Sequence, residues 1–315
     1  MASYRTLHRH ELTETAWRVA IRASDKNEHR VWTPQSAWNV SPGQDAAALA
    51  LVEDSIEPTT KKNDGFVLVS VERNYAGEDR MDGDWLVATM DLHGRVRVND
   101  QSFTVLDATG TTLALCPPRV FLHRQTSVMA IGMLDGSVQI CTTGISVTGE
   151  AVAAGTVVQS LPAHPSVPLS LAWNPDQAKL AVARFDGTVQ IWNVSNGGGS
   201  TLLHQLHPEP CRGLAWLDNN VLVAGNDAGT VCLWEGPRLM RHVFVKSWVL
   251  QILALDARRF VTLERNGSVH VWQLGELDQP VHSFQCPDAF AMAADEGLLV
   301  VTTTTNVLQF YSLKL

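Results

Sequence analysis

Three short stretches contain residue types that could bind a metal ion or a phosphate group. In the first, His10 and Glu11 begin the string HELTE, which resembles the zinc-binding pattern HExxH, but Glu14 stands at the position of the second histidine. A zinc protease needs both histidines on one face of a helix. This stretch has neither the second ligand nor a helical pattern, so we predict no zinc site there.

The second stretch, H-x2-H-x3-C, is formed by His204, His207 and Cys211. The surrounding residues, STLLHQLH, predict a β-strand, and residues three apart on a strand point to opposite faces of the sheet. The two histidines would therefore not converge on one ion. We expect a strand that runs into a turn, and no metal site.

The third stretch, the glycines at 197–199 followed by Ser200, could suggest a phosphate-binding loop. No Lys-Ser or Lys-Thr follows, and the segment joins two predicted strands instead of opening a helix. We expect a flexible connector. The sequence also lacks a GxSxG nucleophile motif. We therefore predict no catalytic, cofactor or metal site and a protein that is not an enzyme, although catalytic residues scattered over several loops would escape this reasoning.

The elements that would position functional residues repeat along the chain. The clearest unit begins at Pro168 and reads PLSLAWNPDQAKLAVARFDGTVQIWNV, and similar units begin at Cys211 and Val249. Each contains an apolar strand, a second strand, a tight turn with Gly and a third strand that ends in Trp. The turn glycines at 94, 136, 187, 229 and 267 are 42, 51, 42 and 38 residues apart. A period of ~40–45 residues is typical of a four-stranded propeller blade.

The local chemistry of the repeats agrees with this period. An Asp-Gly or Asn-Gly pair between two β-rich runs favours a hairpin, because glycine adopts positive φ without penalty. The large side chains that end the third strands, Trp192, Trp234 and Trp272, should pack between neighbouring blades. The spacing of 51 residues is explained by an insertion that starts at Gly144.

These repeats resemble the WD-repeat family over essentially the whole chain. His164 matches the structural histidine that precedes a first strand in that family, and Asp135 and Asp186 match its turn aspartate. The resemblance implies a β-propeller whose faces bind peptides or protein domains. The family's third strands normally end in Trp-Asp, whereas here they end in Trp192-Asn193, Trp234-Glu235 and Trp272-Gln273.

Within that family the chain also resembles the superkiller-complex WD-repeat adaptors, which serve cytoplasmic RNA decay. This second resemblance rests on a His-bearing N-terminus that runs into Ala-Trp-x-Val-Ala at residues 16–20, and on Ser-Trp-Val-Leu at 247–250.

We predict an all-β fold, a single seven-bladed β-propeller over residues 1–315 with four-stranded antiparallel blades. The final blade lacks a fourth strand, and residues 3–8 are placed to supply it by pairing with 307–313, which closes the ring. Residues 16–53 would be the first blade although they lack a recognisable turn glycine, so six blades remain possible if that stretch is irregular. The predicted blades are 16–53, 66–106, 112–162, 168–207, 211–245, 249–285, and 288–313 with 3–8.

Composition narrows the class of protein. Apolar residues make up 45% of the 315 residues and the net charge is −8, without a run of Lys or Arg, so we expect no direct nucleic-acid partner. No apolar run approaches the ~20 residues of a membrane span, and the polar N-terminus does not resemble a signal peptide. The five cysteines fit reduced thiols. We expect a cytoplasmic or nuclear protein without a membrane, small-molecule or cofactor partner.

Large side chains near the starts of first strands predict where partner proteins bind. When the first strands are aligned on the apolar residue before Ala, the equivalent positions two residues earlier are Trp17, Leu169, Arg212, Gln251 and Phe290. Trp248 directly precedes the first strand of the sixth blade. Aromatic residues and Arg are enriched at interface hot spots. The alternative is that Trp17 and Trp248 pack into the core.

A further aromatic side chain, Phe185, precedes an Asp-Gly turn, where polar residues are more usual. The predicted partner-binding residues are Trp17, Phe185, Arg212, Trp248 and Phe290.

The leading interpretation is a non-enzymatic protein-interaction scaffold, an adaptor subunit of a multiprotein complex. The first alternative is a coat or pore-lattice subunit, whose open propeller accepts a blade from its partner. The N-terminal strand separates the two, because a ring closed by its own strand cannot accept that blade. The second alternative is an enzyme with a site in the central channel.

Overall fold

The structure is a computed structural model that describes residues 4–11, 20–23, 29–32, 37–42, 49–53, 66–73, 85–91, 95–98, 101–104, 109–116, 126–146, 153–194, 200–206, 209–295 and 297–313. Side chains are described for Ala88, Met90, residues 95–98 and most of these residues from 109 onward. The chain divides into two compact units. The first is Met1–Lys61 with Gly225–Val231 and His242–Leu315, and the second is Lys62–Ala224 with Cys232–Arg241.

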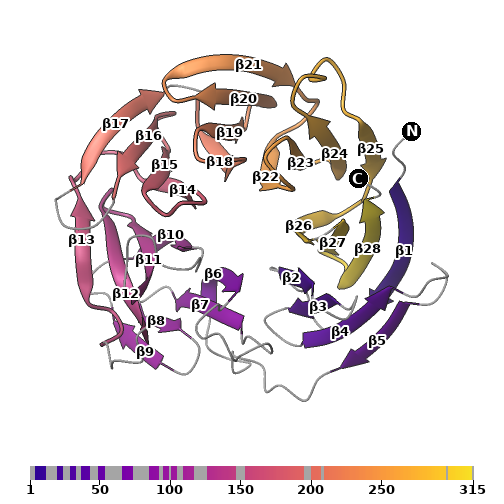
Figure 1. The fold of residues 1–315 in the computed structure, drawn as a ribbon, viewed down its shortest axis with the longest axis horizontal. Coiled ribbons are helices and arrows are strands. Elements are labelled where there is room, and N and C mark those ends of the chain that lie inside the picture. The colour runs from indigo at the N-terminus through magenta and orange to yellow at the C-terminus, as the bar shows by residue number, and fades with distance from the viewer. Residues whose placement is uncertain are drawn as a thin grey trace. The chain divides into compact units, whose positions relative to one another are not determined.

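The described strands form seven four-stranded sheets, the number and kind predicted from the repeats (Figure 1). The strands between residues 20 and 53 form a four-stranded sheet of their own. A count of six blades would have required this stretch to be irregular, which it is not. In chain order the sheets are β2 (Ala20–Ala23), β3 (His29–Trp32), β4 (Ala37–Pro42), β5 (Leu49–Glu53); β6 (Phe66–Arg73), β7 (Trp85–Asp91), β8 (Arg95–Val98), β9 (Gln101–Thr104); β10 (Gly110–Leu115), β11 (Thr126–Met133), β12 (Val138–Ser146), β13 (Val157–Leu161); β14 (Pro168–Trp173), β15 (Lys179–Arg184), β16 (Val189–Asn193), β17 (Thr201–Leu206); β18 (Cys211–Trp216), β19 (Val221–Asn226), β20 (Thr230–Glu235), β21 (Arg238–Phe244); β22 (Val249–Ala254), β23 (Arg259–Glu264), β24 (Ser268–Gln273), β25 (His282–Gln285); and β26 (Ala289–Asp295), β27 (Leu298–Thr303), β28 (Val307–Leu313) with β1 (Tyr4–Glu11).

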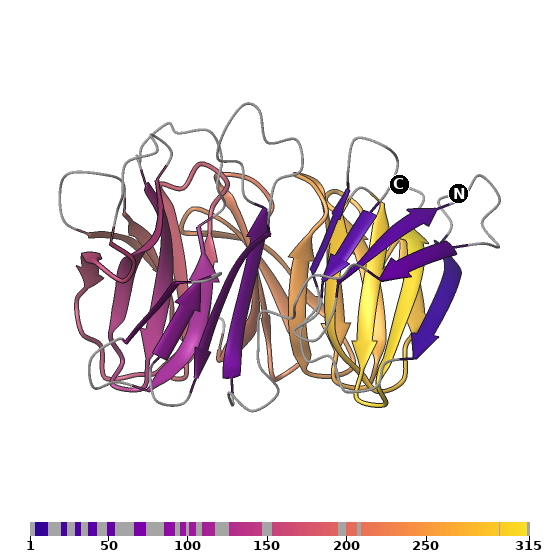
Figure 2. The ribbon, with the colours of Figure 1, turned by 90° about the horizontal axis from the view of Figure 1, so that it is seen from below.

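The N-terminal strand completes the last sheet. β1 pairs antiparallel with β28, joining Tyr4 to Leu313 and Glu11 to Val307, with a register shift between Thr6 and His8. In Figures 1 and 2 the indigo strand β1 runs beside the yellow strands of this sheet. The predicted pairing of the N-terminus with residues 307–313 is confirmed, and the strand extends three residues further than expected. The pairing covers the edge of β28 that would otherwise expose its backbone hydrogen-bonding groups.

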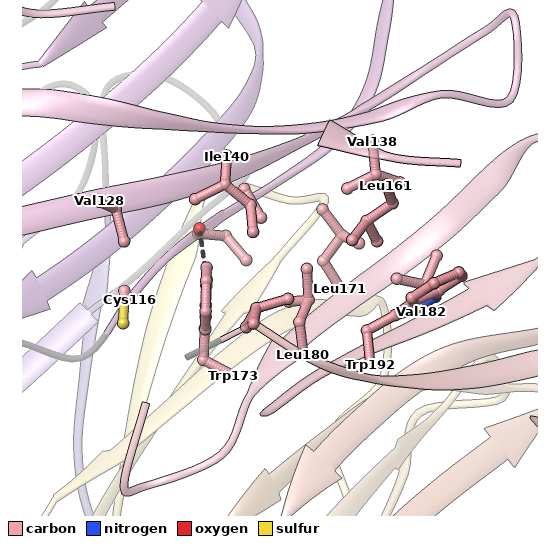
Figure 3. Close-up of a cluster of buried hydrophobic side chains, with 13 residues drawn as sticks. Cys116, Val128, Val138, Ile140, Leu161, Leu171, Trp173, Leu180, Val182 and Trp192 are labelled. Carbon is pink, nitrogen blue, oxygen red and sulfur yellow. Dashed lines mark hydrogen bonds between the residues drawn. The ribbon is translucent and has the colours of Figure 1, made fainter. Parts of the chain in front are cut away.

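The second strands of the sheets are buried on both faces, whereas the outermost strands β17 and β21 are mostly exposed. All six residues of β27 are buried, and so are five of the six in β15, whereas a sheet with one face in water alternates between buried and exposed residues. Figure 3 shows the packing between sheets β10–β13 and β14–β17 in the second unit, where Trp173 and Trp192 lie among aliphatic side chains. The indole of Trp173 donates a hydrogen bond of 3.1 Å to the carbonyl of Ala114 in the preceding sheet.

A second indole repeats this bond between sheets. Trp216 in β18 donates to the carbonyl of Ala172 in β14, again over 3.1 Å. Because the donor sits in an Ala-Trp pair in both first strands, Ala172-Trp173 and Ala215-Trp216, the sequence carries a signal for this bond that our sequence reasoning missed.

The tryptophans that end the third strands are largely interior. Trp192 and Trp272 are buried, and Trp234 is partly buried. Trp192 and Trp234 each pack in a cluster shared by two neighbouring sheets, which confirms the predicted packing between blades for these two residues. Only residues 236 and 237 connect β20 to β21, whereas residues 274–281 connect β24 to β25. Less chain is therefore available to cover Trp234. In the last sheet Tyr311 takes the place of Trp and packs 4.3 Å from the Phe284 ring.

Only one of these three indoles has an acceptor among the described residues. Trp272 donates to Thr262 Oγ1 over 3.0 Å. In the sheet β14–β17, Val182 stands where Thr262 stands in β22–β25, five residues before the turn glycine. Because valine has no hydroxyl, the buried Trp192 Nε1 has no acceptor among the described residues. A buried donor without an acceptor costs about 1–3 kcal/mol, so the two tryptophans contribute differently to stability despite equal positions.

The predicted turn residues adopt the left-handed conformation that the hairpins require. Gly136 and Gly267 have φ of 86° and 80°, and Asn306, which stands in the turn between β27 and β28, has φ of 62°. Space also demands glycine, because a Cβ at Gly267 would come within 2.5 Å of the carbonyl oxygen of Cys286. The turn and the chain that leads to the next sheet thus pack backbone against backbone.

Removal of residues 1–11 should lower Tm and cause aggregation, because it exposes the edge of β28. Differential scanning fluorimetry and light scattering would measure both effects, with removal of residues 314 and 315 as the control. Unchanged Tm and solubility of the long deletion would contradict this role of β1.

Trp192→Ala should destabilise the fold by about 3–5 kcal/mol in denaturant unfolding, as large-to-small core substitutions do. The phenylalanine variants make a sharper comparison. Trp272→Phe strands Thr262 and should cost about 1–2 kcal/mol more than Trp192→Phe, which removes a donor that has no acceptor. Equal costs for the two would show that the Trp272 hydrogen bond contributes nothing.

Candidate functional site

Three of the predicted partner-binding residues are large, exposed aromatic side chains. The exposed fraction is 66% for Phe185, 42% for Trp248 and 44% for Phe290, so the alternative that Trp248 packs into the core is wrong. Arg212, on β18, is also exposed, and Trp17 lies outside the described residues. Phe185 and Arg212 belong to the second unit, and Trp248 and Phe290 to the first. Each unit therefore displays part of the predicted set.

Trp248 directly precedes β22 and is held against the turn between β23 and β24. The guanidinium of Arg265 lies over its ring, with Cζ 4.5 Å from the ring centroid. The Arg265 amide donates to the Trp248 carbonyl over 2.8 Å. A cation–π contact at an exposed site contributes about 0.5–1 kcal/mol. The indole is thus fixed in place while nearly half of it faces solvent, and sequence reasoning missed the arginine that fixes it.

Phe290 lies at a register shift near the start of β26. In β22 the corresponding shift falls at Leu250, so the predicted equivalence of Gln251 with Phe290 was wrong by one residue. A β-bulge inserts one residue on one strand only, and a period read from sequence does not reveal it. The bulge residue in β26 is a phenylalanine that remains exposed.

Gln251 instead joins two sheets of the first unit. Its side-chain amide donates to the Met292 carbonyl over 3.0 Å and accepts from the Met292 amide over 2.9 Å. These are the two bonds that a backbone strand would make. Gln251 therefore positions β26, and with it Phe290, relative to β22, and it does not belong to the partner-binding set.

A rigid turn displays Phe185 in the second unit. The Gly187 amide donates to the Arg184 carbonyl over 3.1 Å, and the Phe185 amide donates to the Val167 carbonyl over 2.9 Å. The buried Arg184 Nη1 donates to the carbonyls of Gly136 and Ser166 over 2.9 and 2.8 Å. Burial lowers the pKa of Arg184 to about 10, which Asp186 partly counteracts. With its backbone held in this way, the turn presents the phenyl ring at little further cost in conformational entropy.

The carboxylate of Asp186 stabilises the same turn. It accepts hydrogen bonds from the Thr188 amide and hydroxyl over 3.0 and 2.8 Å, and His164 Nε2 lies 3.9 Å away. Although partial burial raises the pKa of Asp186, the bonds from Thr188, the charge interaction with His164 and the bond with Ser166 together hold it below 3.8. The family's structural His and turn Asp, inferred from His164 and Asp186, thus lie close together.

One cluster has the order of groups that acyl-transfer enzymes use. His270 Nδ1 lies 2.7 Å from Ser283 Oγ, and His270 Nε2 lies 2.9 Å from a carboxylate oxygen of the buried Glu264. The histidine and the glutamate stand three residues after and before the turn glycine. In the sheet β14–β17 the same two positions hold Arg184 and Gln190. There Arg184 Nε donates a hydrogen bond of 2.8 Å to Gln190 Oε1. The pair therefore recurs as a cross-strand contact of the repeat, which favours a structural role.

No group of three or more His, Cys, Asp or Glu among the described residues could hold a metal ion. His10 and Glu11 lie in the strand β1, not in a helix. Cys211 is buried, and His207 lies outside the described residues. The part of the chain that the structure describes contains no helix with the length and apolar character needed to cross a bilayer. Burial raises the pKa of Cys141 to about 11.

Asp186→Asn should lower Tm near neutral pH, and the difference from wild type should narrow in acid. Because the folded-state pKa of Asp186 lies below 3.8, its contribution is complete above that value and is lost as pH falls through the folded-state pKa. Thermal unfolding of both proteins at about pH 7 and about pH 3 measures the change. A difference that is constant with pH would contradict the charged role of this carboxylate.

Comparison with known proteins supports the repeats and the fold. Residues 155–193 match the family model described as "WD domain, G-beta repeat". Over 199 residues, 61% of this chain, the sequence is 28% identical to the human WD repeat-containing protein 55, of which the match covers 46%. It is 29% identical over 143 residues to the mouse telomerase protein component 1, covering 44% of this chain and 5% of that protein. The chain thus spans less than half the length of these relatives.

Solved structures resemble almost the whole chain. A chain in the crystal structure of the mitotic checkpoint complex superposes with a TM-score of 0.66 and 14% identity, covering 98% of this chain and 94% of that one. The WD40 β-propeller domain of Doa1 gives a TM-score of 0.66 at 13% identity, covering 99% and 97%. At such identities the likeness establishes the fold. The seven four-stranded sheets, the WD-repeat match over residues 155–193 and the propeller neighbours over nearly the full length together show a β-propeller fold built from WD-type repeats.

Proposed function

We propose that this chain is a non-enzymatic adaptor subunit of a multiprotein assembly and that it binds partner proteins through exposed aromatic side chains at the ends of its strands. WD-repeat propellers are in general protein-interaction scaffolds. The observation that carries the proposal is Trp248, an exposed indole fixed by Arg265. Trp and Arg are among the residues most often found at binding hot spots.

The physical argument is one of rigid, exposed apolar area. A solvated turn gains nothing from a phenylalanine or a tryptophan, whereas a partner that buries such a ring gains about 25 cal/mol for each Å² of apolar surface. Phe185, Trp248 and Phe290 lie at ordered backbone positions, so binding loses little conformational freedom there. Phe185 and Arg212 would contact partners at the second unit, and Trp248 and Phe290 would contact them at the first unit.

The pairing of β1 with β28 favours an adaptor over the coat or pore-lattice alternative. An open propeller that accepts a partner's blade needs an unpaired edge, and β1 occupies that edge in the last sheet. Service in a cytoplasmic RNA-decay complex remains a prediction from the N-terminal and Ser-Trp-Val-Leu resemblances. A cytoplasmic or nuclear location likewise remains a prediction.

Affinity purification of tagged full-length chain from native lysate tests the proposal, with co-purifying proteins quantified for wild type and variants. Trp248→Ala and Phe290→Ala should each weaken at least one partner by about 2 kcal/mol, roughly thirtyfold, while Tm stays near that of wild type. Leu203→Ala, at an exposed leucine of β17, is the matched control. If both aromatic variants keep every partner, the binding surface is elsewhere.

A further inference from the structure

The segment that joins β21 to β22 exposes every second side chain. His242, Phe244, Lys246 and Trp248 are exposed, while Val243 is buried and the two other intervening residues are partly buried. The exposed fraction of Phe244 reaches 74%. These residues all belong to the first unit. Residues 242–248, together with Arg265, are called the aromatic–basic strip below.

Backbone contacts fix the course of the strip, which leaves β21 at Phe244 and bends at Lys246 and Ser247 before β22 begins. The Val245 amide donates to the Gly229 carbonyl over 2.8 Å, and a Cβ on Gly229 would lie 2.8 Å from the Val245 oxygen and 3.1 Å from the Ser247 oxygen. The Trp248 carbonyl accepts from the Arg265 amide. The rings of His242 and Phe244 meet edge to face at 5.2 Å. The alternation of exposed side chains is therefore a built feature of the fold.

The strip is basic in an acidic protein. The chain carries a net charge of −8, yet residues 236–255 contain three Lys or Arg and no Asp or Glu. Within the part of the chain that the structure describes, neither Lys246 nor Arg265 has an ion pair or a side-chain hydrogen bond. The guanidinium of Arg265 is nevertheless held in place over the Trp248 ring. A guanidinium stacked on an aromatic ring keeps the planar N–H groups at its edge, which suit bidentate binding of a carboxylate.

We propose that the strip binds an extended acidic segment of a partner protein, with carboxylates facing Lys246 and Arg265 and apolar side chains on Phe244 and Trp248. The proposal rests on the adaptor function and specifies the partner's chemistry. An extended chain advances ~3.3 Å per residue, so side chains on one face recur at every second position. A segment running along the strip would therefore present an apolar residue, an acidic residue and another apolar residue, each separated by one position.

The same residues fit nucleic acid less well. One face of Trp248 is covered by Arg265, which removes a stacking platform for a base. Lys246 and Arg265 supply only two cations from the strip, whereas nucleic-acid binding generally draws on a larger positive field. An acidic peptide needs only a few charge pairs with apolar contacts between them, which is what the strip offers.

Selection of random twelve-residue peptides on the immobilised full chain tests the proposal. Peptides recovered on wild type should be enriched in the apolar–x–acidic–x–apolar pattern. The double charge reversal Lys246→Glu with Arg265→Glu should select Lys- or Arg-rich peptides instead. Recovery of peptides without acidic enrichment, or of the same peptides on the charge-reversed variant, would overturn the proposal.

Fluorescence anisotropy of a selected peptide then assigns the residues. Lys246→Glu, Phe244→Ala and Trp248→Ala should each weaken binding tenfold or more, and added salt should weaken it further. Arg258→Glu, at an exposed arginine in the turn between β22 and β23, is the matched control and should weaken it less than twofold. Tight binding of a labelled oligouridine that Phe244→Ala abolishes would overturn the proposal in favour of nucleic acid.

The two proposals fail in different ways. If Trp248→Ala loses native partners but the selected peptides are not acidic, the adaptor surface stands and the partner class is wrong. If acidic peptides bind the strip but Trp248→Ala keeps every native partner, the strip's chemistry stands and the assigned adaptor surface is wrong.

Discussion

A four-stranded sheet that is apolar on both faces cannot bury itself, and this constraint governs the structure. The consecutive buried residues of β15 and β27 require cover on each side of their sheets. Neighbouring sheets supply it in the cluster around Trp173 and Trp192. Since the indole of Trp173 also has a polar N–H, close packing demands an acceptor, which the Ala114 carbonyl of the preceding sheet provides. Packing and hydrogen bonding are therefore satisfied by the same contact between sheets.

Because the inner strands of the sheets are covered on both faces, the turns, the strand ends and the outermost strands are where side chains remain exposed for binding. The turns are tight enough for that purpose. Glycines with positive φ bring the turn backbone against the chain that leads to the next sheet, as at Gly267 and Cys286. Phe185 and Trp248 project from such well-bonded backbone. The hydrogen bonds that stabilise the repeat thus also preorganise the proposed binding residues.

Electrostatics divides the charged residues into two groups. Arg184 and Glu264 are fully buried, and each is engaged by neighbours, Arg184 by two carbonyls and an amide oxygen and Glu264 by His270. Removing such partners from a buried charge is costly, so these groups serve the fold. Lys246 and Arg265 are exposed and have no ion pair in the described part of the chain, so their charge remains for a ligand.

The sequence by itself determined the features that depend on local pattern. Glycine spacing, alternating apolar residues and the missing last strand predicted the seven sheets and the pairing of β1 with β28. Only the tertiary structure decided features set by residues far apart in the chain. One such feature is the β-bulge that makes Leu250 the counterpart of Phe290. Two others are the hydrogen bonds between Gln251 and Met292 and the stacking of Arg265 on Trp248. Each depends on contacts between separate strands or turns. A repeat period fixes which residues recur, but a one-residue register shift and a contact across 17 to 41 positions leave no periodic signal in the sequence.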